Sequence, residues 1–132
     1  MQVQIKAEKN PAYAVVIEDD QKVAYAYLLH QGKIIGDVWL YNHQTPDHVN
    51  WKDKSQLPFL NPAPYVDASS MIAPVASQQD IFIVWDIEEG GELNEVQVHV
   101  EGKPVAYMKL GSKPGWSVSA SADGPLAKTW KL

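Results

Sequence analysis

The sequence predicts an all-β protein: an antiparallel β-sandwich of two hairpin-rich sheets, with about seven to nine strands and little or no helix. Apolar residues alternate or run together over strand-length segments, and no alanine-rich helical periodicity is present. The order of strand, acidic turn, strand, X-Gly-Lys turn and strand also occurs twice, about 70 residues apart. We therefore expect two similar sheets that face each other, although any antiparallel meander can produce such an order.

The first half contains three expected strands, at residues 12–17, 22–30 and 33–41. A charged turn, Glu18-Asp19-Asp20, follows the first of them, and Gln31-Gly32 joins the other two. Such short turns between apolar segments are typical of antiparallel hairpins.

A two-residue turn at Gln31-Gly32 fixes a register in which residues whose numbers sum to 63 face each other. This register places Tyr27 opposite Gly36 and Tyr25 opposite Val38. The same apolar face then holds two further pairs, Val23 with Leu40 and Leu29 with Ile34. The other face, a mixture that includes Ala24, Ala26, Leu28, Asp37 and Trp39, is expected to be half covered.

The second half repeats this plan. Residues 81–87 form an apolar run broken only by Asp86, and an acidic turn follows. Valines alternate with polar residues over 95–101, and Glu101-Gly102 leads into residues 103–110. The same turn geometry predicts two pairs in this hairpin, Val98 with Val105 and Val96 with Tyr107.

Residues 42–80 contain five prolines. Proline removes a backbone donor, so we expect this region to be mostly loop or sheet edge. A long irregular stretch in a compact domain is usually either functional or loosely ordered. Beyond residue 111 the pattern predicts a short strand within 116–122, a turn at Asp123-Gly124-Pro125 and a last strand at 129–130.

Length and composition indicate one domain spanning residues 1–132, with 45% hydrophobic and 20% charged residues. No apolar run reaches the roughly 18 to 20 residues that cross a bilayer, and the first residues lack a basic segment followed by an apolar stretch. The absence of cysteine excludes disulfides and cysteine-ligated metals. We therefore expect a cytoplasmic protein that does not associate with membranes.

The formal net charge is -5, and all 11 basic residues are lysines. Arginine supplies the planar fork that grips phosphates and guanine edges, so an acidic chain without arginine is not expected to bind nucleic acid. A basic protein partner suits the negative field of this chain.

The densest group of polar and aromatic residues includes His43, Asp47, His48 and Trp51. Imidazole and carboxylate groups ligate divalent metals and transfer protons, but this spacing matches no metal motif. No phosphate-binding glycine loop, dinucleotide fingerprint or serine nucleophile elbow is present. The sequence therefore predicts no catalytic residue, metal or cofactor, and favours a non-enzymatic role.

The chain contains five tryptophans. Trp85 lies within an apolar run and is expected in the core, whereas Trp51 and Trp116 lie among proline, glycine and polar residues. Exposed aromatic side chains anchor interfaces, and acidic turns steer basic partners. The expected partner-binding residues are Trp51, His43, Asp47, His48, Trp116, Glu88, Glu89 and Glu92.

These observations favour an acidic binding protein that recognises a basic protein and neutralises or regulates it, as immunity proteins and inhibitors do. The alternative is a carbohydrate-binding module in which Trp51, Trp116 and Trp39 stack on sugar rings. A third hypothesis is a small metal-dependent enzyme built on His43, Asp47 and His48.

Overall fold

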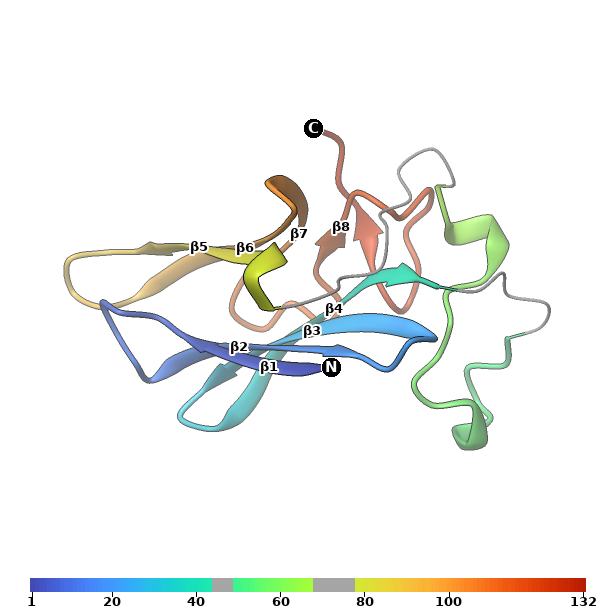
Figure 1. Cartoon of the computed structure of the whole chain (residues 1–132), viewed down its shortest axis with the longest axis horizontal. Helices are drawn as coiled ribbons and strands as arrows, with labels where there is room; N and C mark the ends of the chain where they lie inside the picture. The colour runs from blue at the N-terminus through green and yellow to red at the C-terminus, as the bar shows by residue number, and fades with distance from the viewer. Residues whose placement is uncertain (44–48, 68–77) are drawn as a thin grey trace.

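A computed structural model of the chain describes residues 1–43, 49–67 and 78–132. In this part of the chain two sheets pack face to face around a single hydrophobic core (Figure 1). The first sheet has the strand order β1-β2-β3-β4, and the second has the order β5-β6-β7-β8-β9. The predicted all-β fold is confirmed.

All neighbouring strands pair antiparallel except β8 and β9, which pair parallel. The first sheet contains β1 (Gln2–Lys6), β2 (Tyr13–Asp19), β3 (Val23–His30) and β4 (Lys33–Asn42). The second contains β5 (Ile81–Ile87), β6 (Leu93–Val100), β7 (Lys103–Met108), β8 (Trp116–Ser117) and β9 (Lys128–Thr129). The described helical segments are the short 3₁₀ turns η1 (Lys54–Gln56), η2 (Ala63–Tyr65) and η4 (Gln78–Asp80).

The prediction of element positions is correct for most strands. β1 is an addition, because its Val3 and Ile5 alternate with polar residues over only five positions and give a weak signal. The strands expected in the tail form but are only two residues long. Residues 49–67 contain no strand, as expected for the proline-rich region, and Val66 forms an isolated bridge with Ala120.

None of the helical segments within residues 1–43, 49–67 and 78–132 is long and apolar enough to cross a membrane.

Both X-Gly turns have the geometry that the sequence predicts. Gln31 and Gly32 have φ angles of 51° and 80°, and Glu101 and Gly102 have φ angles of 52° and 80°. Two successive residues with positive φ are characteristic of a type I′ hairpin turn, whose twist matches that of the flanking strands. The glycines adopt this conformation without steric cost.

The predicted registers are correct only beside these turns. In the first hairpin Leu29 pairs with Ile34 as expected, but the next pair joins Leu28 to Gly36, so Ile35 is an extra residue on β4. The predicted pairs Tyr27 with Gly36 and Tyr25 with Val38 are therefore wrong. The observed pairs are Tyr27 with Asp37 and Tyr25 with Trp39.

The second hairpin contains the same irregularity. Val98 pairs with Ala106 in place of the predicted Val105, and Val96 pairs with Met108 in place of Tyr107. In each hairpin the register shifts after the second pair from the turn, which is the signature of a β-bulge. A bulge inserts one residue into one strand, and a period-two pattern of apolar residues does not reveal it.

The two halves therefore share one design. β2 and β5 have seven residues each, and β3 and β6 have eight each. The type I′ turn and the bulge follow at equivalent positions in both halves. The predicted repeat of strand, acidic turn, strand, X-Gly-Lys turn and strand corresponds to these two sheets.

The core lies between the two sheets and is formed by every second residue of their strands, whose side chains point inward. In β3 the small residues Ala24 and Ala26 and the larger Leu28 are fully buried, and Val15 and Ile17 of β2 are on the same face. The sequence patterning assigned Ala24, Ala26 and Leu28 to a half-covered face, and this assignment is wrong. The bulges and the small side chains on the inner face obscure which side of β3 packs against the second sheet.

One side of the sandwich is closed by backbone hydrogen bonds from β4. The amide of Asp37 donates to the carbonyl of Ser112 at 3.0 Å, and its carbonyl accepts from the amide of Gly115 at 2.7 Å. Further along β4, the amide of Trp39 donates to the carbonyl of Leu126 at 2.9 Å. β4 is therefore joined to the segments on either side of β8, which ties the two sheets together.

This close approach depends on glycine. A Cβ atom at Gly115 would lie 2.5 Å from the carbonyl oxygen of Tyr107 and 2.9 Å from Cγ of Met108. A Cβ atom at Gly36 would lie 3.3 Å from the carbonyl oxygen of Ser112. Because Gly36 and Gly115 carry no side chain, the two sheets have room to meet at β4.

We predict that Gly115→Ala lowers the free energy of unfolding by about 1 to 3 kcal/mol, because the added methyl group overpacks a backbone contact. Gly90→Ala is the matched control, since a Cβ atom there meets nothing within 4 Å. Chemical denaturation monitored by tryptophan fluorescence measures both. Equal stability of the two variants would contradict the role assigned to Gly115.

Candidate functional site

A small pocket opens on the outer face of the first sheet. Its volume is about 200 Å³. Its polar lining comes from Tyr25 and Tyr27 of β3 and Asp37 of β4. Its apolar lining comes from the segments that cross this face, namely Leu57, Pro58, Phe59, Pro125 and Leu126. We call this cavity the tyrosine–aspartate pocket.

The pairing of β3 with β4 brings the polar groups together. Tyr27 pairs with Asp37 and Tyr25 with Trp39, so all four side chains project from the same face of the sheet. The rings of Tyr25 and Tyr27 are stacked, with centroids 6.3 Å apart and an interplanar angle of 16°. The pocket is therefore built on two adjacent, rigid strands.

The proline-rich segment forms one wall. The hydroxyl of Tyr25 donates to the carbonyl of Phe59. The side chain of Asn42 holds the same segment, because its Nδ2 donates to the carbonyl of Asn61 at 2.8 Å and its Oδ1 accepts from the Asn61 amide at 3.0 Å. Oδ1 of Asn42 also accepts from the indole nitrogen of Trp39 at 2.8 Å. These bonds fix the wall against the sheet and bury Trp39 completely.

The pocket is anionic and poorly solvated. Burial raises the pKa of the Asp37 carboxyl, an effect that the positive charge of Lys113 partly offsets. Burial also raises the pKa of the Tyr25 and Tyr27 hydroxyls. The carboxylates of Glu18 and Asp37 add to the effect on Tyr27. A carboxylate that is costly to keep charged favours the approach of a cation.

Sequence reasoning missed this pocket because of the bulge at Ile35. In the predicted register Asp37 faces away from Tyr27, whereas the extra residue turns its side chain to the tyrosine face. A pairing rule based on the turn alone does not reveal this shift. The available signal was the pair of tyrosines at alternate positions of β3 beside an acidic residue on β4.

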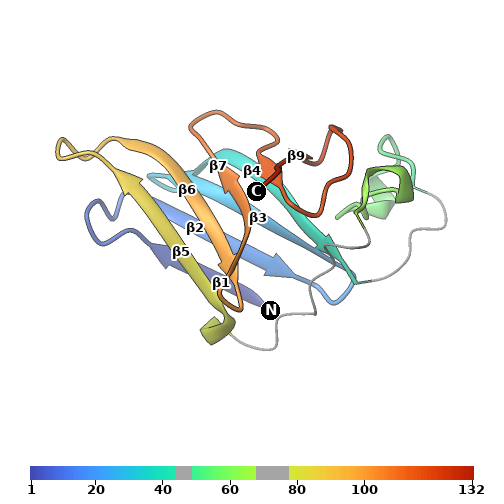
Figure 2. The ribbon, with the colours of Figure 1, turned by 90° about the horizontal axis from the view of Figure 1, so that it is seen from above.

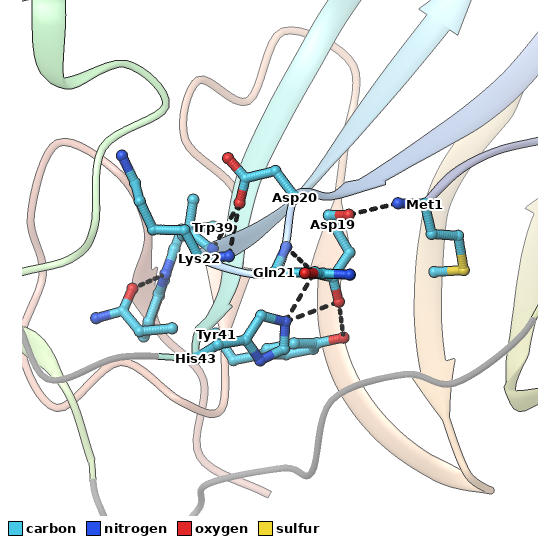
Figure 3. Close-up of polar contacts among 10 residues, drawn as sticks. Met1, Asp19, Asp20, Gln21, Lys22, Trp39, Tyr41 and His43 are labelled. Atoms are coloured by element: carbon cyan, nitrogen blue, oxygen red, sulfur yellow. Dashed lines mark hydrogen bonds and ion pairs between the residues drawn. The ribbon is translucent and has the colours of Figure 1, made fainter.

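A second polar cluster surrounds Asp19 at the end of β2 (Figure 3). Nε2 of His43 lies 2.7 and 2.8 Å from the two carboxylate oxygens of Asp19. The amide of Gln21 donates to the same carboxylate at 2.9 Å, and the hydroxyl of Tyr41 approaches it at 3.4 Å. The cluster links the end of β2 to the end of β4.

The side chains of His43 and Asp19 are only 7% and 5% exposed. His43, predicted to contact a partner, therefore forms a buried pair with Asp19, and its Nδ1 atom is buried with no hydrogen-bond partner among the described residues. Asp47 and His48, the other two residues of the hypothetical metal site, lie outside the described residues. Within residues 1–43, 49–67 and 78–132, no three histidine, aspartate or glutamate side chains are arranged to hold a metal ion.

The predicted acidic residues Glu88, Glu89 and Glu92 are exposed in the turn between β5 and β6. Figure 1 shows this turn and residues 49–65 at opposite ends of the longest axis of the molecule. Trp51 belongs to the latter segment and packs edge-on against Tyr65, with centroids 5.5 Å apart. The structure therefore does not bring the predicted acidic turn and Trp51 into one site.

Trp116 belongs to a third region, on β8. Its ring stacks on Tyr107, with centroids 4.5 Å apart and an interplanar angle of 6°. Nζ of Lys128 lies 5.0 Å from the centre of the Trp116 ring, and Nζ of Lys109 lies 5.9 Å from it. Neighbouring side chains thus occupy much of the surface that a sugar would need, and Trp39 is buried.

The raised pKa of Asp37 predicts a pH-dependent effect of Asp37→Asn on stability. Folding costs free energy when this carboxyl is ionised, so wild-type stability falls as pH rises from the unfolded pKa through the higher folded pKa. The variant avoids this cost. We expect it to be more stable at neutral pH, by less than about 1 kcal/mol because solvent screens a half-exposed group.

This advantage should shrink as pH falls toward about 4 and be lost near about pH 3 and below, where the wild-type carboxyl is mostly protonated in both states. Urea denaturation at several pH values measures it, with Asp86→Asn on the exposed face of β5 as the control. An advantage of Asp37→Asn that did not change with pH would contradict the assignment.

Comparison with known proteins supplies no further guide to the site. No family model, curated protein or solved structure matches this chain.

Proposed function

We propose that this protein is a non-enzymatic binding protein that recognises a basic protein partner by taking a lysine or arginine side chain into the tyrosine–aspartate pocket. The observation that carries this proposal is the placement of Asp37 beside two tyrosine rings in a partly desolvated cavity. In this role the protein would neutralise or regulate its partner, as immunity proteins and inhibitors do.

The lining of the pocket has the chemistry that a cationic side chain requires. Aromatic faces attract cations through the ring quadrupole, and this attraction strengthens when water is removed. A carboxylate adds a charge-assisted hydrogen bond. The pocket combines both kinds of group in Tyr25, Tyr27 and Asp37, while Leu57 and Phe59 offer apolar surface to the aliphatic stem of the ligand.

The size of the pocket favours a side chain over a separate small molecule. Sites for drug-sized ligands usually enclose about 300 to 1,000 Å³. The tyrosine–aspartate pocket encloses about 200 Å³ and is bounded by loop segments that a partner would also contact. A single projecting side chain of a larger partner suits this volume.

The distribution of charge supports a basic partner. All but one of the 16 acidic residues lie before residue 103, whereas five of the 11 lysines lie at or after it. Most of this acidic excess lies between residues 43 and 102, which include the β5–β6 turn and hold ten acidic residues and two lysines, whereas residues 1–42 hold five acidic residues and four lysines. Such a field accelerates encounter with a basic protein and weakens as salt is added.

Binding of a hexalysine peptide tests this function. We expect Asp37→Asn to weaken binding by about tenfold to a hundredfold, because the pocket loses a charge-assisted hydrogen bond and its charge. Wild-type affinity should rise as pH rises through the raised pKa of Asp37, because the ionised carboxylate binds the cation. Isothermal titration calorimetry measures both effects.

Glu89→Gln is the matched control, because it removes one negative charge from the exposed turn between β5 and β6. Equal weakening by Asp37→Asn and Glu89→Gln would indicate that only net charge matters. That result, or the absence of hexalysine binding, would overturn the proposed pocket.

A further inference from the structure

Within residues 1–43, 49–67 and 78–132, no strand pairs with the outer edge of β5. Native proteins protect such edges with lysine, proline, bulges, short strands or covering segments. The edge of β4 is bonded to Ser112, Gly115 and Leu126, and β9 is only two residues long. β1 carries Lys6. In contrast, β5 has seven residues with no lysine or proline, and the register shift in its pairing comes at the last step, where Asn94 of β6 is the extra residue.

β5 also exposes apolar side chains. Phe82 is 66% exposed and Val84 is 37% exposed, and both project from the face of the sheet that points away from the core. Among the described backbone groups, none forms a hydrogen bond to β5 on the side away from β6. The backbone edge of β5 is therefore free to pair with another strand, and its outer face offers apolar side chains for contact.

In the part of the chain that the structure describes, no hydrogen-bonded strand joins the two sheets on the side opposite β4. Figure 2 shows β5 and β1 at this same side of the molecule, each at the edge of its sheet. A groove of about 490 Å³ runs between them, lined by Ile5, Ile83, Trp85 and Ile87 among others. Trp85, predicted to lie in the core, is instead only partly buried beside this groove. Ile5 and Trp85 are partly exposed in this groove, whereas Ile83 and Ile87 are buried, and the charged residues Lys6, Glu8 and Lys9 line it on the side of the first sheet.

We propose that β5 pairs antiparallel with β5 of a second copy of this chain, across a two-fold axis that passes beside Val84. The strand runs from Ile81 to Ile87, and Val84 is its midpoint. This register therefore pairs all of its residues and extends the second sheet of each copy into one continuous sheet. A two-fold axis makes the contact self-limiting, because each copy uses the same edge.

The side chains of β5 suit this register on both faces. On the inner side Ile83 faces Trp85 of the second copy, and Ile81 faces Ile87, so the two grooves meet across apolar residues. On the outer side Val84 faces its own equivalent, and Phe82 faces Asp86. Two carboxylates directly opposite each other would destabilise the ladder, and no such pair occurs within the paired strands.

The position of the acidic turns also permits this pairing. The turn with Glu88, Glu89 and Glu92 follows the end of β5, so antiparallel strands place the two copies of the turn at opposite ends of the joined sheet. The tyrosine–aspartate pocket lies on the outer face of the first sheet, at β3 and β4, and stays open in both copies. The dimer does not depend on the function of that pocket.

Light scattering coupled to size exclusion tests the proposal on the full chain. We expect a mass twice the 14.7 kDa of one chain at high protein concentration. Val84→Lys places two like charges beside the two-fold axis and should raise the dimer dissociation constant by about tenfold or more. Ile34→Lys, at a 51% exposed position of β4, is the matched control and should leave the dimer intact.

A cysteine at position 84 gives a second readout that does not require the dimer to be stable. The chain contains no cysteine, so Val84→Cys introduces a single thiol that lies opposite its equivalent across the axis. Mild oxidation should crosslink this variant rapidly, whereas Ile34→Cys should crosslink slowly. A wild-type protein that is monomeric at about 1 mM, or equal crosslinking of both variants, would overturn the β5 interface.

Discussion

The backbone of Asp37 is the point on which both the fold and the candidate site depend. Its amide and carbonyl bond to Ser112 and Gly115 and so close one side of the sandwich. Its side chain lines the pocket beside Tyr27 on the outer face of the first sheet. A single residue therefore joins the two sheets and supplies the charge of the pocket, and the bulge at Ile35 is what gives it this orientation.

This arrangement places the Asp37 carboxylate where its charge lowers the stability of the folded state, which is consistent with the binding role that we propose. A partly buried carboxylate with a raised pKa costs free energy in the folded state, and such a cost is common at functional sites. The surrounding structure is fixed by many bonds, including those of Asn42 to the wall at Asn61. The rigid surroundings thus keep the Asp37 carboxylate partly desolvated, and a bound cation would offset the free-energy cost of its charge.

The sequence predicts the strands and turns well because these features depend on local patterns. Gln31-Gly32 and Glu101-Gly102 fix type I′ turns, and alternating valines mark β6. That pattern does not indicate the bulges, so the partners that the sequence predicts for Tyr25 and Tyr27 are wrong. The pocket was missed for this reason. The sequence also did not predict that Trp39 and His43 are buried, because their burial depends on contacts with residues that are distant in the sequence.

The pKa of Asp37 with and without a bound cation tests the central claim most directly. Carbon-detected nuclear magnetic resonance can follow the Asp37 carboxyl through a pH titration, first in the free protein and then with saturating hexalysine. A cation beside the carboxylate stabilises its charged form, so the account predicts that the raised pKa falls on binding. A bound peptide that left the pKa of Asp37 unchanged, while shifting that of another carboxyl, would contradict the account.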